Sequence, residues 1–376
     1  MSVRRAVYAA SLDPITNGHI NIIERVAPLY DELVVVVAVA NGKTYTFSAE
    51  ERAEMARLAV SHLTNVRVKV CTGRYVVKLA RDIGAQAIIR GIRTASDLEF
   101  EQALAEENHR ICPTVETVWI PCRPELMFVS SSLVKSHIGA DPLWIKEVER
   151  STPRAVAAKL REKLVLQRAR EHWADLMSML GNPKGSDGVF VRLLSQYSEP
   201  HRAYHDLEHI MNMLDELETV RVLANDFISL SLAIWFHDAV YDTHGKNNEV
   251  RSADMAVEEM LCMDGIVKVN ENIPKLILDT RHAEAPQTPD GRLISDLDLA
   301  ILGKSQEEFD EYEANIRKEY SWVSEDVFAR ERTKILQGFL DRSRIYQTDT
   351  FHERYGKQAR RNLLRSIEKL CSDKPV

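Results

Sequence analysis

The stretch Leu33–Val39, LVVVVAV, decides the fold of the first part of this chain. It is a continuous run of apolar, mostly β-branched residues, which is typical of a parallel strand covered on both faces. Outward from it, further strands are predicted at Ala6–Ala10, Val66–Val70, Ala87–Arg90 and Glu116–Ile120. Helices are predicted between them, at Gly18–Tyr30, from Ser48 onward with Glu51 completing a capping box, at Val76–Ile83 and at Asp97–Cys112. This alternation predicts a Rossmann-like α/β domain wound around a parallel sheet.

The sequence changes in character after about residue 164. Amphipathic helices are predicted at Trp173–Leu180, Tyr204–Leu217, Phe227–Val240, Asn248–Met260, Ile273–Thr280, Ser305–Tyr320 and Thr333–Phe339, with a loop at Asn182–Gly188 and no strand. A chain of 376 residues also exceeds the size at which one core usually keeps growing. We therefore expect an α/β domain over residues 1–164 and an all-α domain over residues 165–376.

Composition narrows the class of protein. The chain is 45% apolar and 28% charged with a net charge of −7, which argues against nucleic acid as a partner. Its five cysteines are scattered and lack a C-x-x-C pair, which favours reduced thiols. The start does not read as a signal peptide, and the longest apolar run, Leu33–Ala40, is too short to span a bilayer. We expect a cytoplasmic protein with no membrane partner.

Polar and cationic residues follow several of the predicted strands. Asp13–His19 (DPITNGH) opens a helix, and a helix N-terminus favours an anion through its unpaired N–H groups and its dipole. Lys43, Arg90–Arg93 (RGIR) and Ser130–Ser132 come after later strands, and the carboxyl ends of parallel strands are where such sheets bind ligands. Singly, each group is explained by a helix cap or a surface ion pair. Together they supply cations and donors without a nucleophile–base pair, which predicts transfer of a phosphoryl-type group.

Four segments resemble, in order and spacing, the motifs of bacterial phosphopantetheine adenylyltransferases. They are SLDPITNGH, NGKTYTFSAEER, RGIRTASDLEFEQALAEEN and FVSSSLVK, and the resemblance runs from Val3 to about Leu164. It implies a nucleotidyltransferase fold, Mg²⁺ as cofactor and a homo-oligomer, usually a hexamer. The implied reaction transfers an adenylyl group from ATP to 4′-phosphopantetheine, giving dephospho-coenzyme A and pyrophosphate in coenzyme A biosynthesis.

The resemblance also implies roles for individual residues. Phosphopantetheine would be bound by Ser11, Lys43, Val76 and Arg90. ATP would be bound by Ser11, Leu12, His19, Arg90, Gly91, Arg93, Phe100, Glu101, Ser130, Ser131 and Ser132. The implied catalytic groups are His19, Lys43 and Arg93, with His19 stabilising charge on the α-phosphate. One departure stands out: Ala10 takes the place of a glycine where the family's backbone approaches the nucleotide, and a β-carbon there would crowd it.

A second set of residues suggests a metal site. His237-Asp238 ends the apolar segment SLSLAIWFHDAVYD, His209 lies upstream, and Asp298 lies downstream. Two histidines and two carboxylates leave coordination positions open for water, as a catalytic site requires. A lone His-Asp pair is usually a surface or capping pair, but burial among apolar residues calls for a strong partner. His201 and His205 are interpreted as capping or packing histidines.

The order His, His-Asp, Asp on a helical background resembles the HD superfamily. RAYHDLEHI, WFHDAVYD, NNEVRSA and DLDLAILG are similar to a branch of predicted phosphohydrolases, over about Gln167 to Ile345. The resemblance implies a divalent metal, of unspecified identity, at His209, His237, Asp238 and Asp298, with Asp296 as the alternative fourth ligand. It also implies that Arg202, Glu249 and His282 hold phosphate or water.

Two alternatives stay open from the sequence. The helical domain could be a non-catalytic module that binds a nucleotide or metal and regulates the transferase. The first domain could instead adenylylate another phosphate acceptor, or transfer a cytidylyl group to a polyol phosphate.

Overall fold

The computed structural model describes residues 3–138, 144–263 and 271–372. The chain divides into two compact units, Met1–Lys163 and Leu164–Val376. The first unit contains β1 (Arg5–Ala10), α1 (Asn17–Val26), β2 (Glu32–Ala38), α2 (Ala49–Ala59), β3 (Val66–Cys71), α3 (Val76–Asp82), β4 (Ala87–Ile92), α4 (Ala95–Ile111), β5 (Glu116–Pro121), α5 (Ser131–His137) and α6 (Trp144–Ser151). Short 3₁₀ turns cover Ala27–Leu29 and Pro124–Leu126. Helix α7 (Arg154–Met179) runs through the boundary between the units.

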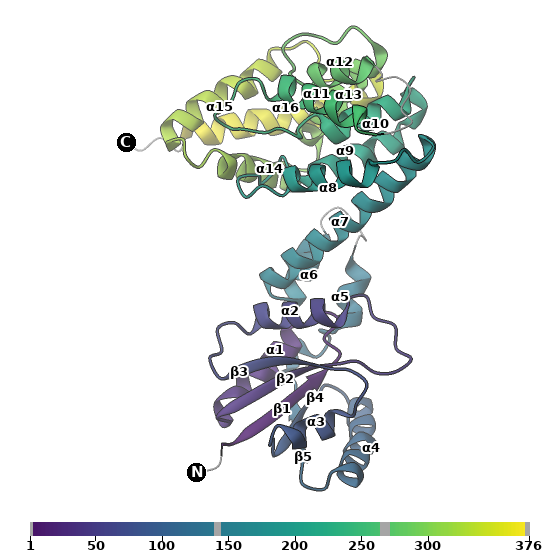
Figure 1. Ribbon diagram of the computed structural model, residues 1–376. Coiled ribbons are helices and arrows are strands. Elements are labelled where there is room, and N and C mark those ends of the chain that lie inside the picture. The colour runs from purple at the N-terminus through teal and green to yellow at the C-terminus, as the bar shows by residue number, and fades with distance from the viewer. Residues whose placement is uncertain (1–2, 139–143, 264–270, 373–376) are drawn as a thin grey trace. The chain divides into compact units, whose positions relative to one another are not determined.

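The strands of the first unit form one parallel sheet in the order β3-β2-β1-β4-β5, with helices on both faces (Figure 1). The central strand β1 pairs with β2 on one side and β4 on the other, so the winding direction reverses beside it. In such a sheet the loops that leave β1 and β4 part at their carboxyl ends and open a crevice for ligands. The predicted parallel α/β fold is confirmed for this unit.

Strand β2 shows why an uninterrupted apolar run makes a central strand. Alternate residues of a strand face opposite sides of the sheet. Leu33, Val35 and Val37 enter the core that includes α1 and α2, whereas Val34 and Val36 enter the core that includes α3. Both faces are covered, so every position must be apolar.

Helix α2 begins where the sequence signal places it. Ser48 accepts a hydrogen bond from the Glu51 backbone, and the Glu51 carboxylate accepts one from the Ser48 backbone at 2.7 Å. The predicted capping box at α2 is therefore present.

The second unit is helical. It contains the C-terminal part of α7, then α8 (Ser186–Tyr197), α9 (Leu207–Thr219), α10 (Phe227–Phe236), α11 (Asn248–Leu261), α12 (Asn272–Asp279), α13 (Pro289–Asp298), α14 (Gln306–Glu319), α15 (Glu325–Leu340) and α16 (Asp349–Ser372), with 3₁₀ turns at Arg221–Leu223 and Leu299–Gly303. Its core is one cluster in which Trp235 packs against Trp173 and Phe190. No strand is assigned in the described part of this unit.

Three helices differ from the sequence expectation. The helix predicted over Phe227–Val240 ends at Phe236, because the carbonyls of Asp238 and Ala239 accept hydrogen bonds from the Arg202 guanidinium, at 2.7 and 3.0 Å, instead of continuing the helix. Helix α8 begins at Ser186, inside the predicted loop Asn182–Gly188. The helix predicted over Trp173–Leu180 is only the last part of α7.

Two further helices, α13 and α16, were not predicted. Helix α16 is rich in charged residues and buries a narrow stripe, which includes Phe351, Tyr355, Ala359 and Leu363 at every fourth position. This spacing is the ordinary pattern of an amphipathic helix, and the sequence interpretation overlooked it.

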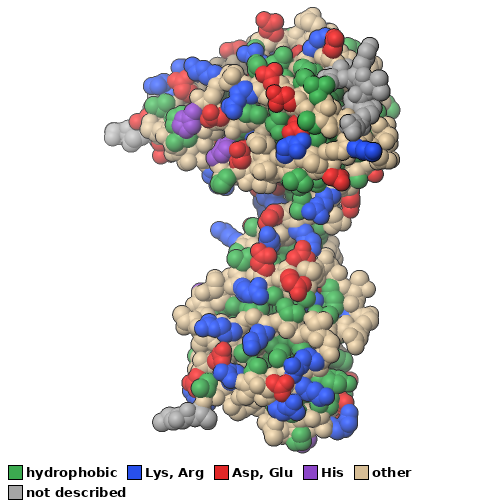
Figure 2. Space-filling model, viewed as in Figure 1, with side chains coloured by type: hydrophobic (Ala, Val, Ile, Leu, Met, Phe, Trp, Pro, Cys, Tyr) green, Lys and Arg blue, Asp and Glu red, His purple; other side chains and the backbone are tan. Residues whose placement is uncertain are grey.

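Side chains of both charge signs are interspersed on the face of each unit seen in Figure 2. In the described residues, the helices are too short or too polar to cross a membrane.

Candidate active site and candidate metal centre

His19 lies in the first turn of α1, at the carboxyl end of the sheet. Its Nδ1 accepts a hydrogen bond from the Thr16 backbone at 3.0 Å and lies 2.8 Å from the Thr16 hydroxyl. Burial and the positive charges of Arg93 and Arg90 lower the pKa of His19 to about 4. The imidazole is therefore neutral at neutral pH, and with Nδ1 accepting, Nε2 carries the proton as a directed donor.

Arg90, near the end of β4, is held in a fixed position. Its guanidinium donates to both carboxylate oxygens of Glu101 on α4, through Nε at 2.7 Å, and to the carbonyl of Ala9 on β1. Glu101 is buried, so this is a bidentate pair in a largely dry setting. Glu101, expected at the adenosine, thus acts on the site by orienting Arg90.

Lys43 and Ser11 meet at the ends of β2 and β1. The Lys43 Nζ donates to the Ser11 hydroxyl at 3.1 Å. Leu12 follows with φ 50° and a buried side chain, so only its backbone is available to a ligand. Lys43 and Ser11 therefore lie at the carboxyl end of β1, where the Arg90 guanidinium also donates to the Ala9 carbonyl.

The three serines differ in what occupies them. Ser130 caps α5 by accepting from the Leu133 backbone at 3.1 Å, and Ser131 donates to the Pro14 carbonyl at 2.8 Å. Ser132 is exposed. The serine run therefore fixes the start of α5 against the loop after β1.

The remaining expected residues are less tightly tied to this group. Arg93 donates to Asp97 at 3.2 Å and is partly exposed. Gly91 has little room for a side chain, since a β-carbon would lie 3.3 Å from Ile22. Phe100 is 66% exposed on α4, and Val76 is half-buried at the start of α3. The described residues give neither of these last two an interaction with His19 or Arg90.

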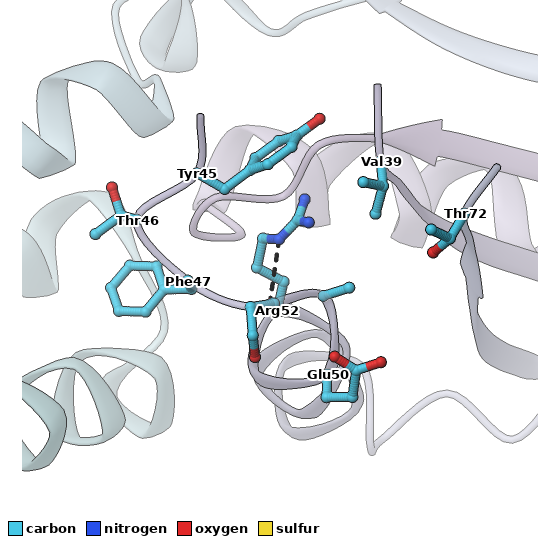
Figure 3. Close-up of a pocket in the computed structure, with 9 residues that line it drawn as sticks. Val39, Tyr45, Thr46, Phe47, Glu50, Arg52 and Thr72 are labelled. Atoms are coloured by element: carbon cyan, nitrogen blue, oxygen red, sulfur yellow. Dashed lines mark hydrogen bonds between the residues drawn. The ribbon is translucent and has the colours of Figure 1, made fainter. Parts of the chain in front are cut away.

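Arg52 is the last residue of the motif NGKTYTFSAEER, and the sequence assigned it no role. It is 1% exposed and donates to the carbonyls of Ser11 at 2.6 Å and Ala38 at 3.3 Å. Figure 3 shows its guanidinium beneath the ring of Tyr45, with 3.9 Å between Arg52 Cζ and the ring centre. The Arg52 side chain thus holds the ends of β1 and β2 in register. Its position among the apolar, buried residues of α2 was the sequence signal that could have indicated a structural role for Arg52.

Asp13 is a second residue that organises these loops. Its carboxylate accepts from the backbones of Thr46 and Phe47, at 3.1 and 3.0 Å, and pairs with Lys135 at 3.0 Å. A cavity of about 430 Å³ lies beside this segment, lined by Val39, Tyr45–Glu50, Arg52 and Thr72 (Figure 3). None of the expected ligand-binding residues lines it.

The parallel α/β fold, with its cationic and polar groups at the carboxyl ends of β1 and β4, is that of a nucleotidyltransferase. Residues 7–137 match the cytidylyltransferase-like family model. The chain is 43% identical over 160 residues to the phosphopantetheine adenylyltransferase of Heliobacterium modesticaldum, covering 42% of this chain and 91% of that protein. It is 39% identical over 158 residues to that of Chromobacterium violaceum, covering 42% of this chain and 96% of that protein. The chain belongs to the phosphopantetheine adenylyltransferase family.

A solved structure also matches this part of the chain. It is nicotinic acid mononucleotide adenylyltransferase from Plasmodium falciparum, complexed with NaAD, at 17% identity and a TM-score of 0.34. The match covers 43% of this chain and 96% of that one. At this score it adds no argument to the family assignment.

The second unit brings together four side chains around one point. The Nε2 atoms of His209 on α9 and His237 just after α10 lie 3.3 Å apart, and Asp298 Oδ1, at the end of α13, lies 3.2 and 3.7 Å from them. Ligand atoms of these three residues lie within 4.8 Å of one another. Asp238 Oδ2 is 3.1 Å from His237 Nε2 and 3.8 Å from His209 Nε2.

This donor set fits a divalent cation. His237 Nδ1 lies 2.9 Å from the Ile234 carbonyl, to which it can donate, and this leaves Nε2 free as a ligand. Burial alone would lower the pKa of His237, but the carboxylates of Asp238 and Asp298 raise it well above its usual value. Converging carboxylates that favour a cation between them would favour a metal ion in the same way. His237 and Asp238 follow the end of α10, whereas the sequence predicted them inside a helix that runs to Val240.

Asp296, the alternative ligand, has another task. Its oxygens accept from the backbones of Gln347 and Thr348, at 2.6 and 2.7 Å, and from the Thr348 hydroxyl at 2.7 Å. It is fully buried and fixes the turn before α16. Of the two carboxylates, Asp298 is the one beside the histidines.

The three residues that were expected to hold phosphate or water have different roles in the structure. The Arg202 side chain binds the backbone carbonyls of His205, Asp238 and Ala239. Because it is fully buried, it is not accessible to a phosphate. His282 Nε2 lies 2.8 Å from Asp298 Oδ2 and orients that carboxylate. Glu249 lies in the first turn of α11, half-buried.

Glu319 is the buried acid that the sequence did not reveal. One oxygen accepts from the backbones of Ala203, Tyr204 and His205, and the other lies 2.7 Å from His205 Nδ1 and 2.9 Å from the Tyr241 hydroxyl. Burial opposes the charged form of His205, but the Glu319 hydrogen bond and the Asp238 charge together raise its pKa. His205 was expected to be a packing or capping residue, and this bond gives it a defined orientation beside the cluster.

Proposed function

We propose that residues 1–164 transfer an adenylyl group from ATP to 4′-phosphopantetheine, giving dephospho-coenzyme A and pyrophosphate. The observation that carries the proposal is geometric: His19 Nδ1 accepts from the Thr16 backbone at the start of α1, and Arg90 is held by Glu101 and the Ala9 carbonyl at the carboxyl end of the sheet. The homologues named above, which carry the phosphopantetheine adenylyltransferase name, supply the acceptor.

In this reaction a phosphate oxygen of phosphopantetheine attacks the α-phosphorus of ATP, and the bond to the β-phosphate oxygen breaks. Lys43 and Ser11 would hold the attacking phosphate, and Arg90 would lie between the two substrates. His19 would donate its Nε2 proton in a hydrogen bond to an α-phosphate oxygen as negative charge builds there. Because these groups position and stabilise without exchanging protons, no general base is needed.

Mg²⁺ would be carried mainly by the phosphates of ATP. The nearby carboxylates are committed, since Asp13 pairs with Lys135 and Glu101 with Arg90. When bound, the ion would neutralise charge on the leaving pyrophosphate.

The test is a direct assay of the purified full chain. With ATP, Mg²⁺ and 4′-phosphopantetheine we expect dephospho-coenzyme A and an equal amount of pyrophosphate. CTP with glycerol 3-phosphate, and ATP with other phosphate acceptors, serve as the comparison. A folded chain that forms product only from one of those other pairs would contradict the proposal.

We further propose that residues 165–376 form an HD-type domain that binds a divalent metal at His209, His237, Asp238 and Asp298 and hydrolyses a phosphoester. The convergence of two imidazole nitrogens and carboxylates within a few ångströms supports it. The metal would lower the pKa of a bound water so that it attacks phosphorus near neutral pH. The chain's own contribution is to hold the ligands through Arg202, His282 and Ile234.

Elemental analysis of the full chain after reconstitution tests this second activity, with Asp238→Ala as the comparison and a broad phosphoester panel as the assay. We expect about one metal ion per chain in the wild type and clearly less in the variant. Equal metal content together with no hydrolysis would reject a metallohydrolase. Metal without hydrolysis would favour the regulatory module.

We also propose that the chain assembles as a homo-oligomer, with a hexamer expected from the family resemblance. Light scattering coupled to gel filtration measures the mass of the assembly, and a monomeric mass at micromolar concentration would refute this.

A further inference from the structure

A cavity of about 630 Å³ lies in the helical unit, which also holds the His–Asp cluster of His209, His237, Asp238 and Asp298. Three segments line it: residues 196–203 from the end of α8 into the following loop, residues 240–251 leading into α11, and residues 318–322 at the end of α14. None of the four proposed metal ligands is among its lining residues. Its size lies within the range of small-molecule sites.

Trp322 forms an aromatic platform in this cavity. The side chain is large and apolar yet 53% exposed. Its indole Nε1 donates to the Thr243 hydroxyl at 2.9 Å, and His244 stacks on the ring with 3.9 Å between ring centres. Both contacts fix the indole in one orientation and leave the rest of its surface open, ready to stack on a flat ring with little loss of entropy.

Two cations of the cavity lack an acidic partner. Within the described residues, Arg251 forms no ion pair or side-chain hydrogen bond, and Lys318 bonds only to the Asn315 amide at 2.8 Å. Two of the three carboxylates that line the cavity are already in use: Glu199 pairs with the buried Arg202 at 3.0 Å, and Glu319 bonds to His205 and Tyr241. Asp242 accepts from the His244 backbone at 2.9 Å. Asp242 has no cationic partner among the described residues, so the unpaired charges of the lining are two cations and one carboxylate, a net positive charge.

We propose that this cavity is a binding site for a nucleoside monophosphate. The base stacks on Trp322, and the phosphate binds Arg251 and Lys318. A flat ring and an anion joined in one molecule meet both features, whereas a sugar phosphate uses only the cations and a free base only the platform. Gln196 and Thr243 add polar groups at the cavity lining for the base edge or the sugar.

This inference does not depend on the metal proposal, because the lining excludes the cluster residues. It also differs from the ATP site of the transferase, which is built from the first unit alone. Nucleotide binding here should survive metal removal.

Hydrogen–deuterium exchange of the full chain, read by mass spectrometry at peptide resolution, tests the proposal. The probe is AMP in EDTA, with adenosine and ribose 5-phosphate as separate arms. We expect slower exchange in residues 240–251 and 318–322 with AMP. We expect adenosine and ribose 5-phosphate each to need roughly tenfold more ligand or to give no effect, since stacking of a base is worth about 1–3 kcal/mol.

Variants locate the effect. Trp322→Leu and Arg251→Gln should each raise the AMP concentration for half-maximal protection by roughly tenfold, whereas Trp322→Phe, which keeps a flat ring, should stay close to wild type. Arg330→Gln, an exposed cation of α15 that does not line the cavity, is the matched control. Asp238→Ala should leave the protection intact.

Four results would overturn the site. The first is no protection of these two segments at about 10 mM AMP. The second is equal protection in Trp322→Leu and Arg251→Gln. The third is equal protection by ribose 5-phosphate, which would reduce the cavity to a phosphate site. The fourth is loss of AMP protection in Asp238→Ala, which would assign the binding to the His–Asp cluster instead.

Discussion

His19 shows how a single residue acquires a chemical role from its neighbours. Free histidine titrates near neutral pH, but burial beside two arginines favours the uncharged ring. The Thr16 backbone then fixes which nitrogen accepts and which donates. The imidazole becomes a permanent donor aimed from a helix N-terminus, which is what a developing negative charge requires.

Replacing this donor should be costly. We expect His19→Ala to lower the turnover of adenylyl transfer on the order of 10²-fold, because one preorganised donor to the transition state is lost. Dephospho-coenzyme A formation at saturating substrates measures the effect. Ser61→Ala, which removes an exposed hydroxyl just after α2 that has no expected role in the site, should leave the turnover close to wild type. Full activity in His19→Ala would show that charge is stabilised elsewhere.

The depressed pKa of His19 has a pH signature. Because the folded pKa is lowered to about 4, the ring should stay neutral as the pH falls from about 8 to 5.5, where an ordinary histidine becomes charged. An NMR titration of imidazole nitrogens, with His19→Gln used to assign the signal, checks this. A His19 midpoint near pH 6.5 would contradict the buried, cation-flanked environment.

Ala10 gives a further test of the same crevice. It ends β1 immediately before Ser11, where the family resemblance places a glycine. We expect Ala10→Gly to keep the fold and to leave ATP affinity unchanged or improved, since it removes a β-carbon near the nucleotide. Equilibrium binding of ATP measures it, and a clearly weaker affinity would show that the β-carbon does not crowd the ligand.

At the scale of elements, two aspartates at the end of α13 have different structural roles. Asp296 and Asp298 are two residues apart, yet one faces the turn before α16 and the other faces the histidines. On a helix, residues at this spacing point in different directions, so only one of them can reach a given site.

The two acids should therefore fail differently when truncated. Asp296→Ala should lower the free energy of unfolding by about 3 kcal/mol, because buried donors of Gln347 and Thr348 lose their acceptor. Asp298→Ala should instead reduce metal content. Denaturant unfolding and elemental analysis of both variants give the comparison. Metal loss in a folded Asp296→Ala protein would reverse the assignment of the two carboxylates.

At the scale of the whole molecule, the candidate active site and the candidate metal centre lie in two separate compact units. Each unit has its own core and its own set of charged side chains. The chain therefore behaves, in our proposal, as two active sites made as one polypeptide.

Separate sites predict separable losses. Asp238→Ala should reduce metal content and any phosphoesterase activity while adenylyl transfer stays within about twofold of wild type. His19→Ala should show the reverse pattern. Assaying both activities on both variants is sufficient. A large fall in adenylyl transfer in a folded, metal-depleted Asp238→Ala protein would demonstrate coupling between the units.

The sequence by itself determined the parallel α/β fold of the first unit, its strands and its nucleotidyltransferase motifs. The reason is local: a continuous β-branched run, a capping box and a glycine-containing loop constrain nearby backbone directly. It also pointed to His209, His237, Asp238 and Asp298, since histidine and aspartate in an apolar context stand out without any structure.

Only the tertiary structure decided how the side chains divide their tasks. Arg202 clamps the carbonyls that end α10, Glu319 orients His205, and Arg52 joins two strand ends, through contacts that span 36, 114 and 41 residues. The tryptophan platform at Trp322 likewise depends on Thr243, 79 residues away along the chain. Such contacts leave no periodic or motif signal, because they are set by how whole elements pack rather than by adjacent residues.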